Sequence, residues 1–404
     1  MSRARDLADY VSTGVTSTEL DKLDGLTATT DELNLVDGSV TGPLSHRNMI
    51  INGGMQVWQR GTSSTALSNS NNYVPDRFNC RAGVGSGHTA IRSTDVPTTG
   101  EASFSNSLKF TVGTGATLSA GNGNNYFYYA MEGYDSNPTK IGTAYAKIMT
   151  ISFWVKASVT GVYGFAVSNN DNARTYAGSY TVGSANTWEK HTITIPASGA
   201  GGTWDTTNGR AITLLWNWGA GSNFIASSAG WATADDRGGV DAGSSIHLVD
   251  GTHNGATWYI TGVQLELGSV ATPFEHKSYG EELARCKRYY QEVFGNGHAV
   301  NATAVWFLDG TNWSMNMHLP KEMRATATAT VIGTGVNTSG GSSQTDKWAL
   351  YVNGGWKGCS SISVTSISAR TFRLDGQVND SVSGGNAGGL YNGTACYIQL
   401  SAEL

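Results

Sequence analysis

Four closely spaced aspartates are the residues whose type best suits chemistry: Asp235, Asp236, Asp241 and Asp250. Converging carboxylates serve two purposes in proteins, the acid and base of a glycosidase and the ligands of a Ca²⁺ site. The spacing alone does not bring these four together, and most acidic side chains in loops are simply solvated. The chain also has no G-x-S-x-G, H-E-x-x-H or Walker sequence. We therefore expect no catalytic residue, and a protein that is not an enzyme.

The histidines give no sign of a metal site. His247 and His253 flank Asp250, but the sequence offers no third ligand at the spacing that zinc sites use. The four cysteines form no C-x-x-C pair and are expected to be buried, reduced thiols. We assign no metal ligand and no cofactor.

The aromatic residues are more informative, because one face of a sugar ring is apolar and stacks on an exposed aromatic ring while amides and carboxylates bind the hydroxyls. The candidate ligand-binding residues are Trp348, Tyr351, Trp356, Tyr126, Tyr128 and Tyr134. The alternative is that aromatic residues fill the core. Strand alternation favours the core for Trp306 and Trp313. For Trp348 and Trp356, which lie near Gly354 and Gly355, both interpretations stay open.

Composition predicts the fold class. The chain has 404 residues, enough for two or three domains, with 14% charged residues, 52 Gly, 12 Trp and 17 Tyr. Short strands, glycine-rich turns and polar aromatic surfaces produce such a composition, so we expect an all-β protein.

Charge and hydropathy exclude two kinds of partner. The net charge is −5, and the basic residues are scattered, so the positive surface that nucleic acid requires is missing. No apolar run is long enough for membrane insertion, and the N-terminus is too polar for a signal peptide. We expect the chain to be made and assembled in a cytoplasm.

Residues 1–45 form a segment of short helical units. Residues 16–25 and 29–38 repeat with a period of 13, and each copy opens with a T-x-x-E capping box and ends at Gly. Such short units cannot bury their apolar residues within one chain, so we expect attachment or trimerisation through Leu7, Val11, Leu20, Leu23, Leu33 and Val36. The alternative is a flexible tail with nascent helices.

Residues 46–277 are expected to form a jelly-roll-like sandwich. Alternation and β-branched or aromatic residues predict strands at 107–112, 147–157, 162–168, 187–196, 211–218 and 256–267, with a bulge at Gly262. Residues 119–140 and 219–239 are expected to be long loops.

A linking helix is expected over residues 278–295, followed by a smaller distal β-sandwich over 296–404. Ser278 and Glu281 form a capping box, and Gly295 ends the helix. Its apolar stripe would be Tyr279, Leu283, Cys286, Tyr290 and Val293. Beyond it, Asp309-Gly310 predicts a type I′ hairpin, and further strands are expected at 326–333, 347–352, 361–367, 369–374 and 394–404.

Three phrases resemble the tail fibre and receptor-binding proteins of tailed bacteriophages. They are SRARDLADYVSTGVTSTELDKLDG, NMIINGGMQVWQRGTS and GVQLELGSVATPFEHKSYGEELARCKRYYQ. The similarity is close over residues 1–60 and 256–294, looser at YVPDRF and ISFWVKAS, and limited to LSAEL in residues 295–404.

The resemblance implies a homotrimeric fibre in the virion tail, assembled in the host cytoplasm. Its N-terminus would attach to a tail or baseplate protein, and its distal β-domains would recognise a host-cell polysaccharide. The resemblance carries over no catalytic residue. The alternatives are a tail depolymerase that hydrolyses host glycans and a purely structural tail or baseplate component.

Overall fold

The computed structural model describes residues 47–64, 66–99, 103–199, 201–241, 245–294, 301–333, 335–336, 347–353, 355–379, 381–382, 387–392 and 396–404. The predictions for residues 1–45, with Leu7, Val11, Leu20, Leu23, Leu33 and Val36, lie outside these residues. So do the predicted helix end at Gly295 and the glycine at 354.

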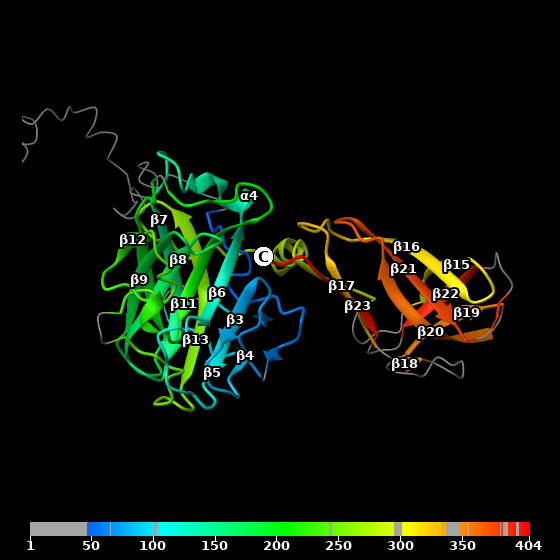
Figure 1. The fold of residues 1–404 in the computed structure, drawn as a ribbon, viewed down its shortest axis with the longest axis horizontal. Coiled ribbons are helices and arrows are strands. Elements are labelled where there is room, and N and C mark those ends of the chain that lie inside the picture. The colour runs from blue at the N-terminus through cyan, green and yellow to red at the C-terminus, as the bar shows by residue number, and fades with distance from the viewer. Residues whose placement is uncertain are drawn as a thin grey trace, which may run out of the picture.

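The central part is a sandwich of two antiparallel sheets with the predicted jelly-roll-like character (Figure 1). The six-stranded sheet has the order β1 (Ser63–Ser64), β4 (Thr89–Ser93), β5 (Ser107–Thr111), β13 (Thr257–Leu267), β7 (Met149–Ala157) and β10 (Glu189–Ile195). The seven-stranded sheet has the order β12 (Gly230–Ala232), β9 (Thr175–Val182), β8 (Gly161–Ser168), β11 (Arg210–Asn217), β6 (Asn125–Glu132), β3 (Phe78–Ala82) and β2 (Asn72–Tyr73). Short helical turns lie at α4 (Gly133–Ser136), η1 (Asn137–Thr139) and η2 (Ser222–Phe224).

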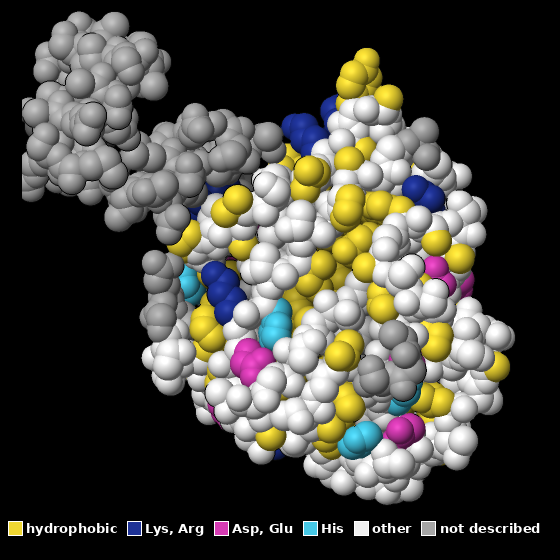
Figure 2. All heavy atoms as spheres, turned by 90° about the vertical axis from the view of Figure 1, so that its left-hand side faces the viewer, with side chains coloured by type: hydrophobic (Ala, Val, Ile, Leu, Met, Phe, Trp, Pro, Cys, Tyr) yellow, Lys and Arg dark blue, Asp and Glu magenta, His cyan; other side chains and the backbone are white. Residues whose placement is uncertain are grey.

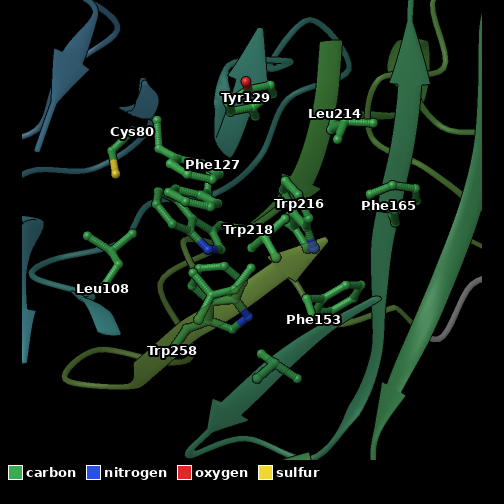
Figure 3. Packing of buried hydrophobic residues seen from close by; sticks show 14 of the residues in the cluster. Cys80, Leu108, Phe127, Tyr129, Phe153, Phe165, Leu214, Trp216, Trp218 and Trp258 are labelled. Atoms are coloured by element: carbon green, nitrogen blue, oxygen red, sulfur yellow. The ribbon is translucent and has the colours of Figure 1, made fainter. Parts of the chain in front are cut away.

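Aromatic side chains fill the space between the two sheets (Figure 3). Trp218 stacks on Phe110 with 3.7 Å between ring centroids, and Trp258 meets Trp218 edge-on. The indole N–H of Trp258 donates to the hydroxyl of Tyr180 at 3.0 Å, which satisfies a donor that burial would otherwise penalise. Burial of these rings therefore holds the sandwich together.

The six strands predicted for this part are confirmed as β5, β7, β8, β10, β11 and β13. The bulge is confirmed as well, because the register between β13 and β7 shifts between Thr261 and Gln264. Gly262 has φ 63° there, and a Cβ on it would lie 2.6 Å from the ring of Phe104. Only glycine fits both the backbone angle and the space.

One predicted loop is wrong. Residues 125–132, placed in a loop over 119–140, form β6, which lies between β11 and β3 and is buried along its whole length. Phe127 and Tyr129 face the core, whereas Tyr126 and Tyr128 face the other side of the sheet. Because both faces carry aromatic residues, the strand lacks the apolar–polar alternation that marks a half-buried strand.

The distal part is also all-β. The strands of its larger sheet are β19 (Lys347–Val352), β20 (Gly355–Thr365), β21 (Thr371–Val378), β16 (Asn312–His318), β15 (Asn301–Phe307) and β22 (Ala387–Asn392), with β18 (Gly335–Val336) at the side of β19. Because β22 also pairs with β19, the first six strands close into a ring. A three-stranded sheet of β14 (Tyr290–Val293), β23 (Tyr397–Ser401) and β17 (Thr328–Ile332) packs beside it, and β17 contacts β20.

The predicted hairpin joins β15 to β16, but the type I′ turn is wrong. That turn needs positive φ at both central residues, and Gly310 is not among the residues with positive φ. The Asp309 carboxylate instead accepts hydrogen bonds from the backbone N–H groups of Thr311 and Asn312, at 2.9 and 2.8 Å. A longer loop held by an aspartate side chain therefore replaces the two-residue turn.

The linking helix α5 is shorter than predicted and spans Tyr279–Cys286. Its N-cap is as expected, since the Ser278 hydroxyl accepts from the N–H of Glu281 at 3.2 Å. Tyr279, however, is 57% exposed, and Tyr290 and Val293 belong to β14, which pairs with β23. Pairing with a strand more than 100 residues away overrides the helical spacing of these two side chains.

The two parts meet around α5 and the last residues of the chain, next to the C label in Figure 1. The Arg77 guanidinium pairs with the Glu403 carboxylate, donates to the carbonyl of Ala130 at 2.6 Å and lies 3.4 Å from the ring centroid of Tyr289. Arg60 also pairs with Glu403, at 3.0 Å. We call this set of contacts the junction.

Asn52 ties the first residues of the sandwich into the junction. Its side-chain oxygen accepts from the backbone N–H groups of Gln56 and Val57, and its side-chain NH₂ donates to the backbone carbonyls of Val57 and Asp76. Its backbone N–H donates to the carboxylate of Glu282 in α5 at 2.7 Å. Its φ of 62° is one that asparagine tolerates better than most residues. Two of the phrases that resemble tail fibres, the one with Asn52 and the one with Glu282, thus meet at one buried site.

All four cysteines are buried free thiols, as the sequence predicts. Over the described residues, no helix combines the length and the apolar character that crossing a bilayer requires.

Candidate functional site

A hollow of about 410 Å³ lies on the outer face of the distal ring. We call it the ring pocket. In the strand register, Ser314, Asp375 and Ser363 stand side by side on β16, β21 and β20, and Asn312, Gln377 and Ser361 form the next row. Their neighbours Met315 and Leu374 are buried in the core, so the alternation of the strands turns the polar residues outward. Apart from Ser314, these residues line the pocket with hydroxyl, amide and carboxylate groups, and the guanidinium of Arg373 joins them, with its Nε 2.7 Å from the Asp375 carboxylate.

Exposed apolar side chains border the ring pocket. Trp306 is 65% exposed and stands opposite Ser314, and Leu308, which lines the pocket, is 62% exposed. The prediction that Trp306 belongs to the core is wrong, because Val305 and Phe307 occupy the inward positions of β15. Trp313 is fully buried, as predicted. An aromatic surface thus lies one strand away from the polar rows.

The two aspartates of the ring pocket have lowered pKa values. The amide of Asn312 and the backbone N–H groups of Asn312 and Thr311 bond to the carboxylate of Asp309 and lower its pKa to about 2. Burial raises the pKa of Asp375, but hydrogen bonds from Thr365, Arg373 and Ser314 outweigh it and lower the pKa below the ordinary value. Both groups are therefore carboxylates at neutral pH and act as hydrogen-bond acceptors.

The other predicted residues of the distal part separate into two kinds. Trp348 is 1% exposed and packs in the core, so it has no free face for a sugar, which corrects its place among the candidates. Tyr351 is 46% exposed, and its ring meets that of Trp356 at 5.2 Å, edge-on. These two rings lie on β19 and β20, and neither is among the residues that line the ring pocket.

A second hollow, of about 110 Å³, lies on the outer face of the seven-stranded sheet. We call it the tyrosine–arginine pocket, after Tyr126, Tyr128, Arg81, Arg210 and Arg237. The two predicted tyrosines are only 5% and 3% exposed, so they form its floor and are not the exposed stacking surface that the sequence suggested.

Two asparagines hold the polar groups of this pocket. The side-chain oxygen of Asn71 accepts from the Tyr128 hydroxyl at 3.2 Å and from Arg81 Nε at 3.0 Å. That of Asn124 accepts from the Tyr126 hydroxyl and from Arg237 Nη1, both at 3.2 Å. Burial raises the pKa of Tyr128, and the charges of Arg81 and Arg210 oppose that rise. Sequence reasoning missed the arginines, because residues 81 and 210 come together only through strand pairing and residue 237 reaches them from a loop.

Tyr134, the last predicted residue, is 56% exposed on α4 and lines neither pocket. Figure 2 shows the end of the central sandwich that faces away from the distal part, where hydrophobic side chains form a band among polar ones.

The aspartates between 235 and 250 do not form a common site. Asp235 pairs with Arg237, Asp241 contacts His247 at 3.0 Å, and Asp250 contacts His253 at 3.3 Å. In the described part of the chain, no three His, Cys, Asp or Glu side chains are placed to hold a metal ion.

Comparisons with known proteins identify no family: no family model and no curated protein matches the chain. Among solved structures, one similar chain is the enzymatically active domain of tailspike protein 4 from bacteriophage CBA120, with 15% identity and a TM-score of 0.28 over 55% of this chain and 21% of that chain. Another is the CBM22-1 xylan-binding domain of Paenibacillus barcinonensis Xyn10C, with 13% identity and a TM-score of 0.27 over 55% and 96% of the two chains. A third is the family 11 carbohydrate-binding module of Lic26A-Cel5E from Clostridium thermocellum, with 14% identity and a TM-score of 0.22 over 47% and 86%.

These solved structures include a phage tailspike domain and carbohydrate-binding modules. Their identities and TM-scores are too low to carry a statement about function.

Proposed function

We propose that the chain is a bacteriophage tail fibre that adsorbs to a polysaccharide of the host surface through its distal β-domain. The observation that carries the proposal is the ring pocket, in which two rows of hydroxyl, amide and carboxylate groups lie beside the exposed Trp306. A pyranose needs both elements, an aromatic surface for its C–H face and acceptors and donors for its hydroxyls. The resemblance of residues 1–60 and 256–294 to tail fibres supports the same function.

The proposal includes a homotrimer attached to a tail or baseplate protein of the virion through residues 1–45. A single shallow saccharide site is weak, with a Kd of about 1 mM, so three copies on one fibre would supply the avidity that adsorption needs. Sedimentation of the full-length protein tests the trimer, with an expected mass three times the 42.6 kDa of one chain. A stable monomer at micromolar concentration would contradict it.

In this proposal the ring pocket binds a glycan and does not hydrolyse it. A glycosidase needs one carboxyl whose pKa is raised, so that it is protonated and can act as the acid. The pKa values of Asp309 and Asp375 are both lowered, which supports binding over a depolymerase. Incubation with capsular polysaccharide from a strain that the protein binds tests this point, and release of reducing ends would contradict it.

Adsorption tests the function itself. Fluorescently labelled full-length protein is applied to a panel of bacteria with different surface polysaccharides, and Trp306→Ala and Asp375→Asn are then compared on a strain that binds. We expect both changes to reduce binding at least about tenfold, because each removes a contact to the sugar. Tyr145→Ala is the matched control, since Tyr145 is an aromatic residue 82% exposed on the central sandwich.

Unchanged melting temperature is required for both variants, so that loss of binding reports the site and not the fold. If both variants bind as well as the unchanged protein, the ring pocket is not the adsorption site. Binding to none of the strains, and to purified surface polysaccharides from none of them, would favour the purely structural alternative.

A further inference from the structure

The described residues that line the tyrosine–arginine pocket include three arginines and no acidic side chain. Arg81 comes from β3, Arg210 from the start of β11 and Arg237 from the loop before β13. Arg237 pairs with the carboxylate of Asp235. Within the described residues, Arg81 and Arg210 have neutral oxygens as hydrogen-bond partners, from Asn71 and Asn170. Three guanidinium groups therefore line this pocket, and one of them pairs with a carboxylate outside the lining.

This local charge is opposite to that of the whole chain, which has 31 acidic and 26 basic residues. None of the described residues that line the pocket carries a carboxylate, since Asp235 lies outside the lining. The positive charge is thus a property of this one hollow and does not follow from the composition.

The guanidinium groups are held in place before any ligand arrives. Asn170 binds Arg210 twice, through its side-chain oxygen at 2.7 Å and its carbonyl at 2.8 Å. Arg81 shares the oxygen of Asn71 with Tyr128 and lies 5.9 Å from the ring centroid of Tyr128. Each guanidinium has five N–H donors, so donors remain on both after these bonds. Side chains fixed in this way lose little conformational entropy on binding.

We infer that the tyrosine–arginine pocket binds a saccharide unit that carries a negative charge, either the carboxylate of a uronate or a phosphate ester. The inference rests on the proposed function, that the chain binds a surface polysaccharide, and adds the chemical class of one of its units. A planar guanidinium forms two parallel hydrogen bonds with a carboxylate or a phosphate, and their opposite charges strengthen these bonds. A neutral hydroxyl gains nothing from the charge of the guanidinium.

The dimensions of the pocket fit this assignment. Its volume of about 110 Å³ is below the roughly 300 Å³ at which drug-sized pockets begin. It therefore receives one ring or one charged substituent, and a longer chain of sugars would extend beyond it. The phenol floor of Tyr126 and Tyr128 excludes water from one side, which strengthens a charge-assisted hydrogen bond.

Calorimetric titration of the full-length protein tests the inference with three probes: trigalacturonate, neutral cellotriose and glucose 1-phosphate. At low ionic strength we expect an anionic probe to bind at least about tenfold more tightly than cellotriose, and the difference to shrink in 0.5 M salt as screening increases. Arg81→Gln and Arg210→Gln should each weaken the anionic probe about 10- to 100-fold and leave cellotriose within about threefold.

Two further variants separate charge from folding. Arg92→Gln removes the same charge from an exposed residue of β4, in the other sheet, and should change nothing. Arg81→Lys keeps the charge without the planar fork, and should retain part of the affinity that Arg81→Gln loses. Preference for glucose 1-phosphate over trigalacturonate would support the inference and identify phosphate as the charged group.

Equal affinity for charged and neutral probes, absence of binding to all three, or unchanged affinity in both glutamine variants would overturn the inference. The proposed function is judged separately, by adsorption of the Trp306 and Asp375 variants. Loss of adsorption in those variants without any preference for anionic probes would leave the function standing and remove the inference alone.

Discussion

The junction between the two parts gives the sharpest test of the energetics. Glu403 is the carboxylate that both Arg77 and Arg60 contact, and its side chain is 5% exposed, against 1% for Arg77. Removing one partner of a buried ion pair leaves the other charge without compensation and costs about 3 to 5 kcal/mol. In Glu403→Ala, Arg77 keeps the carbonyl of Ala130 and the rings of Tyr289 and Tyr129 near its guanidinium, none of which carries a compensating charge.

We expect Glu403→Ala to lower the free energy of unfolding by about 3 kcal/mol or more, which is over a hundredfold in the equilibrium constant. Urea titration followed by tryptophan fluorescence measures it. Because a chain with two parts need not unfold in one step, limited proteolysis around α5 provides a second readout, and cleavage there should become faster.

The matched control is Glu322→Gln, which removes the same charge from an exposed pair. Arg370 lies 2.9 Å from Glu322, but the two side chains are 74% and 49% exposed, so solvent screens the pair and the change should leave the free energy of unfolding nearly unchanged. If Glu403→Ala costs no more than Glu322→Gln, the junction is hydrated and the two parts are not held together by the buried pair.

Trp313→Ala should lower the free energy of unfolding by about 3 to 5 kcal/mol, because it leaves a cavity in the core. Trp306→Ala should change the free energy of unfolding by no more than about 0.5 kcal/mol, and similar values for the two variants would show that Trp306 is not exposed. Gly262→Ala should cost more than about 1 kcal/mol, since φ is positive and the new Cβ meets the core. Gly280 lies in helix α5, where an added Cβ meets nothing within 4 Å, so Gly280→Ala should stabilise the protein by up to about 1 kcal/mol. A higher melting temperature for Gly262→Ala than for Gly280→Ala would contradict both of these glycine predictions. Burial, and then the nearby carboxylate of Glu132, raises the pKa of Asp135, so the contribution of this group to stability is present at low pH and is lost as pH rises through the raised pKa. The free energy of unfolding of Asp135→Asn should therefore increase relative to that of the unchanged protein between pH 4 and pH 7, and equal pH profiles for the two proteins would refute this.

Strands in which apolar side chains alternate with less apolar ones could be predicted from the sequence even where both faces are buried, and a strand with aromatic residues on both faces could not. In β7, Met149, Ile151 and Phe153 alternate with less apolar neighbours, and the prediction is accurate within two residues. In β6, aromatic residues occupy both faces, so the period-2 signal vanishes, and the flanking Gly and Asn residues suggest a loop.

Alternation fixes which residues share a face, but not which face is inside. On β15, Val305 and Phe307 share one face and Trp306 has the other, and the larger ring was assigned to the core. The closed ring decides otherwise, because only one face of each strand points into a closed barrel. The same closure places Trp348 inside and Tyr351 outside.

The arginines of the tyrosine–arginine pocket were beyond sequence reasoning for a different reason. Arg81 and Arg210 are separated by 129 positions and belong to strands that lie on either side of β6, the strand that was missed. Without β6 in the sheet, nothing in the sequence indicates that the two charges are neighbours.

The pairing of β14 with β23 has a practical consequence for engineering. The chain leaves the sandwich for the ring through Tyr290–Val293 and returns through Tyr397–Ser401, and these two strands lie side by side with Val293 opposite Ile398. Opposite residues in an antiparallel pair are only about 5 Å apart, so the 104 residues between Val293 and Ile398 form an insertion whose two ends nearly touch. A foreign domain with adjacent termini could be grafted at these two positions, leaving α5, Glu403 and the central sandwich unchanged, to give chimeric proteins with exchanged tips.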